Sequence, residues 1–156
     1  MKRIFLLSAL AIFIFSSCKK EVTEVQKVDQ AFSAVYTIAP SDWSSTDGNL
    51  SFSAQMNVPE VDDVIYNQGA VLVYISFNGT GYYEALPEVF DGITYGAIHS
   101  KGTVTIDISA LSGEAINAPT QNISAKVILI DATKLGLHKD VNLNDLKAVQ
   151  KAFNIQ

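Results

Sequence analysis

Three stretches of the chain alternate between apolar and polar residues. They cover residues 31–38, 50–58 and 103–109. Successive side chains of a β-strand point to opposite faces, so this alternation predicts strands that bury one face and expose the other. The expected inward-facing residues are Phe32, Ala34, Tyr36 and Ile38 in the first stretch and Val104, Ile106 and Ile108 in the third.

Two other stretches, residues 70–77 and 125–130, are apolar on both faces. Such runs are typical of strands that are covered from both sides, and we expect them to be central in a sheet. Shorter strands are predicted at residues 82–86, which end at Pro87, and at residues 93–99, which follow an Asp-Gly turn signal.

Two segments carry the punctuation of helices. Residues 59–69 have acidic side chains early and a glycine at the end, which predicts one or two helical turns. Asn142 is a candidate N-cap for a C-terminal helix over residues 143–153. Three apolar residues share one face of that helix at spacings of three and four, so we expect it to dock on the strands. They are Leu146, Val149 and Phe153.

Mostly antiparallel strands at short intervals predict a mainly β protein. We expect an antiparallel β-sandwich, Ig-like or related, with one short helical turn and a C-terminal α-helix, because a sheet with one apolar face must bury it against another layer. An open sheet with the helix lying across it is the alternative. Residues 31–156 have the length of a single domain with one core.

The N-terminus has the order of a secretory signal. Two basic residues precede an apolar run from Ile4 to Phe15, and Ser16, Ser17 and Cys18 follow. A membrane-spanning helix needs about 20 apolar residues, so this run is too short to serve as one. Residues 1–17 therefore read as the signal peptide of a bacterial lipoprotein, with Cys18 as the residue that is lipidated. Ordinary cleavage nearby, with Cys18 left as a free thiol, is the alternative.

Residues 18–30 are polar and alternate in charge, which predicts a tether between the lipid and the domain. Acyl chains on Cys18 would hold the protein to a membrane. We therefore expect a lipid-anchored protein of the cell envelope, attached to the outer membrane and facing the periplasm or the exterior.

The distribution of charge limits the classes of partner that the protein can bind. The chain has a formal net charge of −5, and residues 31–100 contain neither lysine nor arginine. The only arginine, Arg3, lies in the signal peptide. Nucleic-acid binding relies on Lys and Arg to neutralise phosphates, so the composition disfavours a nucleic-acid partner.

The sequence offers little to support catalysis or a cofactor. His99 and His138 are far apart in the chain, and there is no Gly-x-Ser-x-Gly motif for a nucleophilic serine. The only cysteine is Cys18, so the domain has no thiolates for a zinc site. We predict no catalytic residue, no metal site and no cofactor.

Acidic residues suggest two weaker alternatives. A calcium loop over residues 131–142 lacks carboxylates at three ligand positions. A calcium site could instead form where two acidic loop groups meet, and these groups are Glu60, Asp62 and Asp63 on one side and Glu84, Glu88 or Asp91 on the other. Glu84 and Glu88 could also form the carboxylate pair of a hydrolase.

Aromatic residues are the candidates for binding. Trp43, Tyr82 and Tyr83, together with Tyr66, could stack on sugar rings or anchor a protein interface if they are exposed. The alternative is that they close the ends of the core. Tyr82 and Tyr83 would face opposite ways if both lay in a strand, so one of them is expected to face the core.

One set of segments is informative when taken together: Trp43, Val58-Pro59-Glu60, Gly69 to Tyr74, Leu86-Pro87, Val104 to Ile108, Val127 to Ile130 and Val141 to Phe153. As a set, they resemble the C-terminal domain of small, uncharacterised lipoproteins of Bacteroidota. The resemblance implies the same fold and a lipid-anchored location, and it brings no activity with it. Some relatives carry a collagen-like stalk where this chain has a short charged tether.

The sequence thus predicts a lipid-anchored, non-enzymatic structural or interaction module. A glycan- or protein-binding module that uses Trp43, Tyr82 and Tyr83 is the first alternative. A carboxylate-pair hydrolase is the second.

Overall fold

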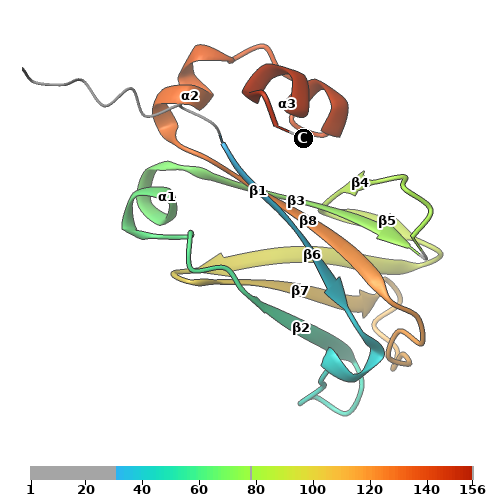
Figure 1. Cartoon of the computed structure of the whole chain (residues 1–156). Coiled ribbons are helices and arrows are strands. Elements are labelled where there is room, and N and C mark those ends of the chain that lie inside the picture. The colour runs from blue at the N-terminus through green and yellow to red at the C-terminus, as the bar shows by residue number, and fades with distance from the viewer. Residues whose placement is uncertain (1–30, 78, 156) are drawn as a thin grey trace, which may run out of the picture.

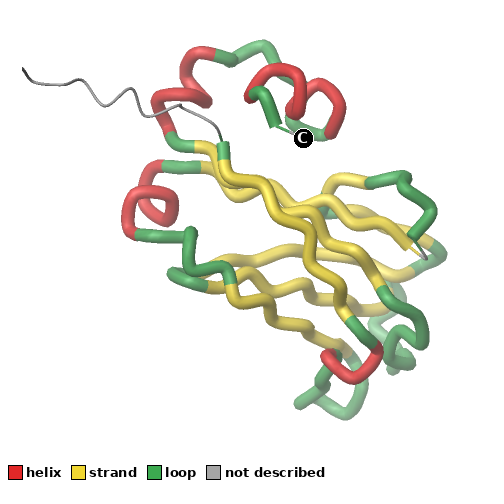
Figure 2. The backbone as a smooth tube through the Cα atoms, in the orientation of Figure 1, coloured by secondary structure: helices red, strands yellow, loops and turns green. Residues whose placement is uncertain are grey.

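The structure is a computed structural model that describes residues 31–77 and 79–155. Two four-stranded antiparallel sheets pack face to face in this part of the chain, and a layer of helices covers the outer face of one of them (Figures 1 and 2). The predicted antiparallel β-sandwich is therefore confirmed. The predicted signal peptide and tether, residues 1–30 with Cys18, lie outside the described residues.

The first sheet, which we call sheet A, has the strand order β1-β8-β3-β4. Its strands are β1 (Phe32–Ile38), β8 (Ile123–Ile130), β3 (Ala70–Phe77) and β4 (Glu84–Ala85). The two strands predicted to be central, at residues 70–77 and 125–130, are the inner strands β3 and β8 of this sheet.

The second sheet, sheet B, has the order β2-β7-β6-β5. Its strands are β2 (Ser51–Asn57), β7 (Thr103–Ala110), β6 (Ile93–Ser100) and β5 (Glu88–Phe90). The chain passes from sheet A to sheet B between β4 and β5, where the peptide bond before Pro87 is cis. The strand predicted at residues 82–86 is thus shorter than expected, and a second short strand follows the proline.

The main core lies between the two sheets. Val104, Ile106 and Ile108 of β7 are buried in it, as the alternation predicted. They face Val73 of β3 and Val127 of β8, which are buried in the same cluster. The alternating side chains of both sheets thus form one apolar layer.

A second, smaller core lies on the other face of sheet A. The helices α2 (Ala132–Leu137) and α3 (Leu146–Phe153) pack there, above the sheet in Figure 1. The buried residues of this core come from both layers and are Ala31, Tyr74, Ile128, Ile130, Val149 and Phe153. Because β3 and β8 are covered on one face by sheet B and on the other by helices, both of their faces are apolar.

The helices differ in detail from the prediction. The C-terminal helix begins at Leu146 with Asp145 as its N-cap, so the prediction that Asn142 caps it was wrong. Asn142 instead accepts a hydrogen bond from the Asn144 amide at 3.1 Å, which makes a local turn ahead of the helix. Helix α2 and a 3-10 turn, η1 (Pro40–Asp42), were not predicted.

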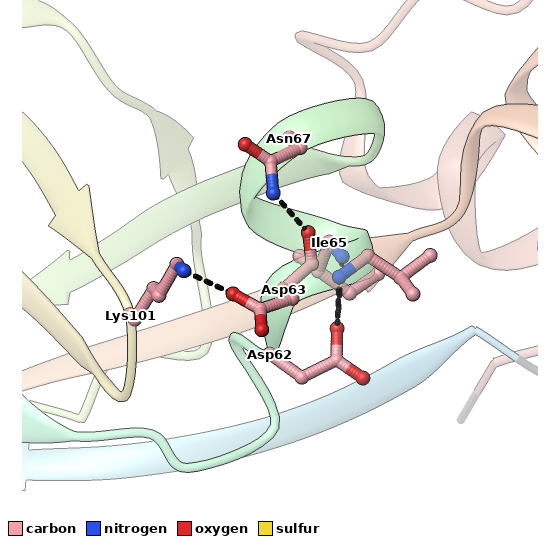
Figure 3. Close-up of polar contacts among 6 residues, drawn as sticks. Asp62, Asp63, Ile65, Asn67 and Lys101 are labelled. Carbon is pink, nitrogen blue, oxygen red and sulfur yellow. Dashed lines mark hydrogen bonds and ion pairs between the residues drawn. The ribbon is translucent and has the colours of Figure 1, made fainter.

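The expected short helix is α1 (Asp63–Gln68), which joins the two sheets. The Asp62 carboxylate caps it by accepting hydrogen bonds from the amides of Val64 and Ile65, each at 2.9 Å. Asp63 forms an ion pair with Lys101 of the β6–β7 turn (Figure 3). The helix thus begins at acidic residues and has Gly69 as its C-cap, as the sequence indicated.

Candidate functional site

A pocket of about 510 Å³ lies on the helix-covered face of sheet A. It is bounded by the segment between β3 and β4 and by the start of α3, and we call it the tyrosine pocket. Its lining includes Tyr82, Tyr83, Lys126, Asn144, Lys147 and Gln150. The volume lies within the range of small-molecule sites, roughly 300–1,000 Å³.

Two of the predicted aromatic residues meet in this pocket. Tyr82 is 81% exposed, whereas Tyr83 is partly buried and packs against the core beneath the helices. Neither residue belongs to a strand, because β4 begins only at Glu84. The two side chains can therefore line the same cavity, although adjacent residues of a strand would face opposite ways.

Lys126 contributes a nearly buried cation to the pocket. It lies on β8, in register with Val35 of β1 and Tyr74 of β3. Only 9% of the residue is exposed, although it lines the cavity. Lysines are rarely buried to this extent without interactions that offset desolvation.

A partly buried hydrogen bond supports the wall of the pocket that leads into α3. The Tyr74 hydroxyl donates to the carbonyl oxygen of Leu143 at 2.6 Å, which ties the loop before α3 to the middle of sheet A. Tyr74 has no exposed surface. Burial, and next to it the charge of Asp145, raises the pKa of Tyr74 to about 12. The phenol therefore stays a neutral donor at physiological pH.

The start of α3 follows this loop and forms that wall, opposite the segment that carries Tyr82 and Tyr83. One Asp145 oxygen, Oδ1, accepts hydrogen bonds from the amides of Lys147 at 2.9 Å and Ala148 at 3.2 Å. The helix end is thus capped by the chain itself. The side chains of Asn144, Lys147 and Gln150 line the cavity and bring amide and ammonium groups beside the two tyrosines.

Trp43 does not belong to this surface, so the idea that it shares a binding patch with the tyrosines is corrected. It is only 7% exposed and packs in the core between the sheets. The next residue, Ser44, pairs with Ser53 of β2, and this pairing folds the Trp43 segment against sheet B. Among the described residues the indole Nε1 has no hydrogen-bond partner.

The other polar candidates have local contacts elsewhere. Tyr66 of α1 meets His99 edge to face, with ring centroids 6.0 Å apart, and the Lys101 ammonium lies 5.8 Å from the Tyr66 ring centroid. His138 contacts the Phe153 ring at 4.9 Å between centroids. These interactions place both histidines away from the tyrosine pocket.

The acidic residues are also dispersed. Asp62 caps α1 and Asp63 pairs with Lys101, while Glu84 and Glu88 lie on strands of different sheets. Within residues 31–77 and 79–155, no three His, Cys, Asp or Glu side chains gather in a way that could hold a metal ion.

No family model, curated protein or solved structure gives a significant match to the chain. The resemblance to lipoproteins of Bacteroidota therefore stays a prediction from the sequence. In the part of the chain that the structure describes, no helix is both long and apolar enough to cross a membrane.

Proposed function

We propose that this protein is a lipid-anchored, non-enzymatic binding module of the cell envelope that takes a carbohydrate in the tyrosine pocket. The observation that supports the proposal is the convergence of Tyr82 and Tyr83 with amide and ammonium side chains in one cavity. Of the aromatic residues that the sequence suggested for binding, Tyr82 and Tyr83 line this pocket together.

The chemistry of the lining suits a sugar. A sugar ring has apolar C–H faces and a rim of hydroxyl groups that both donate and accept hydrogen bonds. Tyr82 offers a flat and largely exposed ring for the apolar face. Asn144 and Gln150 each carry a carbonyl oxygen and an amino group, so they can accept from one hydroxyl and donate to another.

The wall of the pocket is prepared before a ligand arrives. The Tyr74 hydrogen bond ties Leu143 to the sheet, and the Asp145 cap orders the first turn of α3. A binding site whose walls are already ordered loses less conformational entropy on binding. This supports recognition by a fixed surface.

The anchor follows from Cys18 and the tether. Residues 18–30 extend at most about 45 Å, which lets the domain stand off the membrane surface. Nothing in the proposal requires the domain itself to touch lipid.

The hydrolase alternative has weaker support. Glu84 and Glu88 lie on opposite sides of the crossing between the sheets, on β4 and β5. The Glu88 carboxylate accepts a hydrogen bond from the Val89 amide at 3.0 Å. A protein partner that anchors on Tyr82 is the alternative ligand.

The binding proposal can be tested with the full chain purified in detergent and an array of neutral and acidic oligosaccharides. Binding should be detected, and Tyr82→Ala should weaken it about fivefold, since an aromatic contact contributes on the order of 1 kcal/mol. Tyr66→Ala is the matched control, because Tyr66 is also an exposed tyrosine but lies on α1. Equal losses from both variants, or no binding to any oligosaccharide, would reject a carbohydrate site in the pocket.

The anchor is tested separately. Cells that make the Cys18→Ala variant should incorporate no labelled palmitate into the protein, and the protein should leave the membrane fraction. A variant that still fractionates with membranes would show that Cys18 is not the anchor.

A further inference from the structure

The four edges of the two sheets are protected unequally. Strands β4 and β5 have 2 and 3 residues, so two edges are short. The β2 edge is partly occupied, because Ser44 and Ser53 exchange two backbone hydrogen bonds of 3.0 and 2.8 Å. The β1 edge is 7 residues long, and no backbone group of residues 32–38 bonds outward to any other described residue.

β1 also lacks the features that usually prevent edge pairing. Charged residues, prolines and bulges discourage another strand from joining an exposed edge. The segment Phe32–Ile38 contains no charged residue and no proline. Its register with β8 runs one to one from Phe32↔Leu129 to Ile38↔Ile123, without a bulge. This edge can therefore accept a further strand along its whole length.

From these observations we infer that β1 is an assembly edge, at which a second copy of this chain adds its own β1 in antiparallel orientation. The result is a continuous eight-stranded sheet with β8 and β3 on either side of the paired strands. The inference concerns a different surface from the tyrosine pocket, which lies beside β4 at the opposite edge of sheet A.

Charge favours a second copy at this place. The chain has a net charge of −5, so two copies repel each other over most of their surfaces. The uncharged β1 is a place where two identical surfaces can meet without opposing like charges. Like charges directly opposite each other destabilise a strand pair, and β1 itself contains no charged residue. The Glu60 carboxylate lies near the strand, since burial and, after it, the charge of Glu60 raise the pKa of Tyr36.

The sequence of β1 matches itself when the two strands are centred on Val35. Val35 then faces the Val35 of the second copy, and Ser33 faces Thr37. On the inner face, Phe32 comes opposite Ile38. Val35 is 55% exposed in the single chain, so pairing removes a β-branched side chain from water.

The tether is long enough for two copies on one membrane. A strand of 7 residues spans about 23 Å, which is the separation of the two chain starts in an antiparallel pair. Each tether reaches up to about 45 Å, so both lipids of the proposed anchor can insert in the same leaflet. Confinement to a membrane also raises the effective concentration of the partner copy.

Disulfide trapping in intact cells that express the full chain tests this inference. Val35→Cys should give a disulfide-linked species of twice the monomer mass after mild oxidation, and reduction should remove it. Val89→Cys is the matched control, because Val89 is 47% exposed on the edge strand β5 and should stay monomeric. The parent chain, whose only cysteine is Cys18, sets the baseline.

A second pair of variants checks the register and guards against a fold defect at Val35. The double variant Ser33→Cys, Thr37→Cys should be trapped as a dimer, whereas Thr37→Cys alone should be trapped far less. The inference is overturned if neither Val35→Cys nor the double variant gives a dimer above the baseline. It is equally overturned if Val89→Cys links as well as Val35→Cys, or if the trapped species contains a different protein.

Discussion

Replacing Tyr74 by phenylalanine isolates the hydrogen bond that ties the helical layer to sheet A. The substitution removes one oxygen atom and keeps the buried ring, so it creates almost no cavity. It also leaves the Leu143 carbonyl oxygen without the donor that lies 2.6 Å away. A hydrogen bond contributes about 1 kcal/mol net, and an unsatisfied acceptor that is fully buried costs about 1–3 kcal/mol, so the partly buried Leu143 carbonyl oxygen belongs at the low end of that range.

We expect Tyr74→Phe to lower the free energy of unfolding by about 1.5 kcal/mol. With an unfolding entropy of about 2.1 cal/mol/K per residue, a domain of about 125 residues should melt about 6 °C lower. Tyr82→Phe is the control, because it removes the same atom from a tyrosine that is 81% exposed. Thermal unfolding followed by circular dichroism measures both variants.

The pH dependence gives an independent measurement of the burial of the Tyr74 phenol. The pKa of Tyr74 is about 12 in the folded protein and about 10 in an unfolded chain, because burial disfavours the phenolate. The neutral phenol thus stabilises the fold fully below pH 10, and this contribution is lost as pH rises from 10 through 12. Tyr74→Phe should remove this part of the alkaline loss of stability. A Tm equal to that of Tyr82→Phe, with an unchanged alkaline profile, would refute the role given to Tyr74.

Three further predictions concern the frame of the domain. Val127→Asp should unfold it, because it puts an unpaired charge where no surface is exposed, whereas Val64→Asp on exposed α1 should leave its melting nearly unchanged. Gly69→Ala should destabilise the domain by about 1–3 kcal/mol, since a Cβ there would lie 2.9 Å from the Ile130 carbonyl oxygen. Gly136→Ala is the control, because a Cβ at this position meets open space and alanine should stabilise α2. Chemical denaturation compares the two variants. NMR titration should find the pKa of Asp47 at about 2, because hydrogen bonds from Ser51 and Ser45 favour the carboxylate. Ser51→Ala should raise the pKa of Asp47. An Asp47 pKa near 4 in the parent chain would contradict these hydrogen bonds.

The long strands were predictable because burial imposes a simple period on them. Val104, Ile106 and Ile108 alternate with polar residues, since β7 has one face in the core and one face in solvent. The two-sided apolar pattern of β3 and β8 correctly indicated cover on both faces. β5 escaped prediction because its 3 residues are all exposed and carry no burial pattern.

The short helices and the pocket depend on contacts that no local pattern records. Helix α2 has 6 residues and contains Gly136, so its intrinsic helix propensity is low. Its N-cap, Asp131, is no specific signal, because aspartate is common in turns as well. Asn142 and Asp145 are both good capping residues, and the packing of Leu146 against the sheet decides between them. Tyr82 and Tyr83 could be chosen as candidates by type, yet their meeting with Gln150 requires the fold.

Trp43 shows why exposure is hard to read from a polar neighbourhood. It is flanked by Asp42 and Ser44, as a surface residue often is. Its burial depends on the pairing of Ser44 with Ser53, which turns the side chain into the space between the sheets. Only the tertiary structure supplies that partner strand.

The two proposed surfaces lie far enough apart on sheet A for both to be used at the same time. The tyrosine pocket adjoins β4 and the assembly edge is β1, and these are the two outer strands of sheet A. Pairing through β1 would therefore leave both pockets open at the far ends of the joined sheet. Two sites held on one rigid body bind a repeating ligand more tightly than either site alone, provided that the ligand spans them. A polymeric glycan meets that condition. The variant Val35→Lys puts like charges opposite each other at the paired edge and should prevent pairing. It should therefore weaken binding to a long glycan and leave binding to a single short oligosaccharide unchanged. Equal affinity of the parent and Val35→Lys proteins for the long glycan would show that the two surfaces work independently.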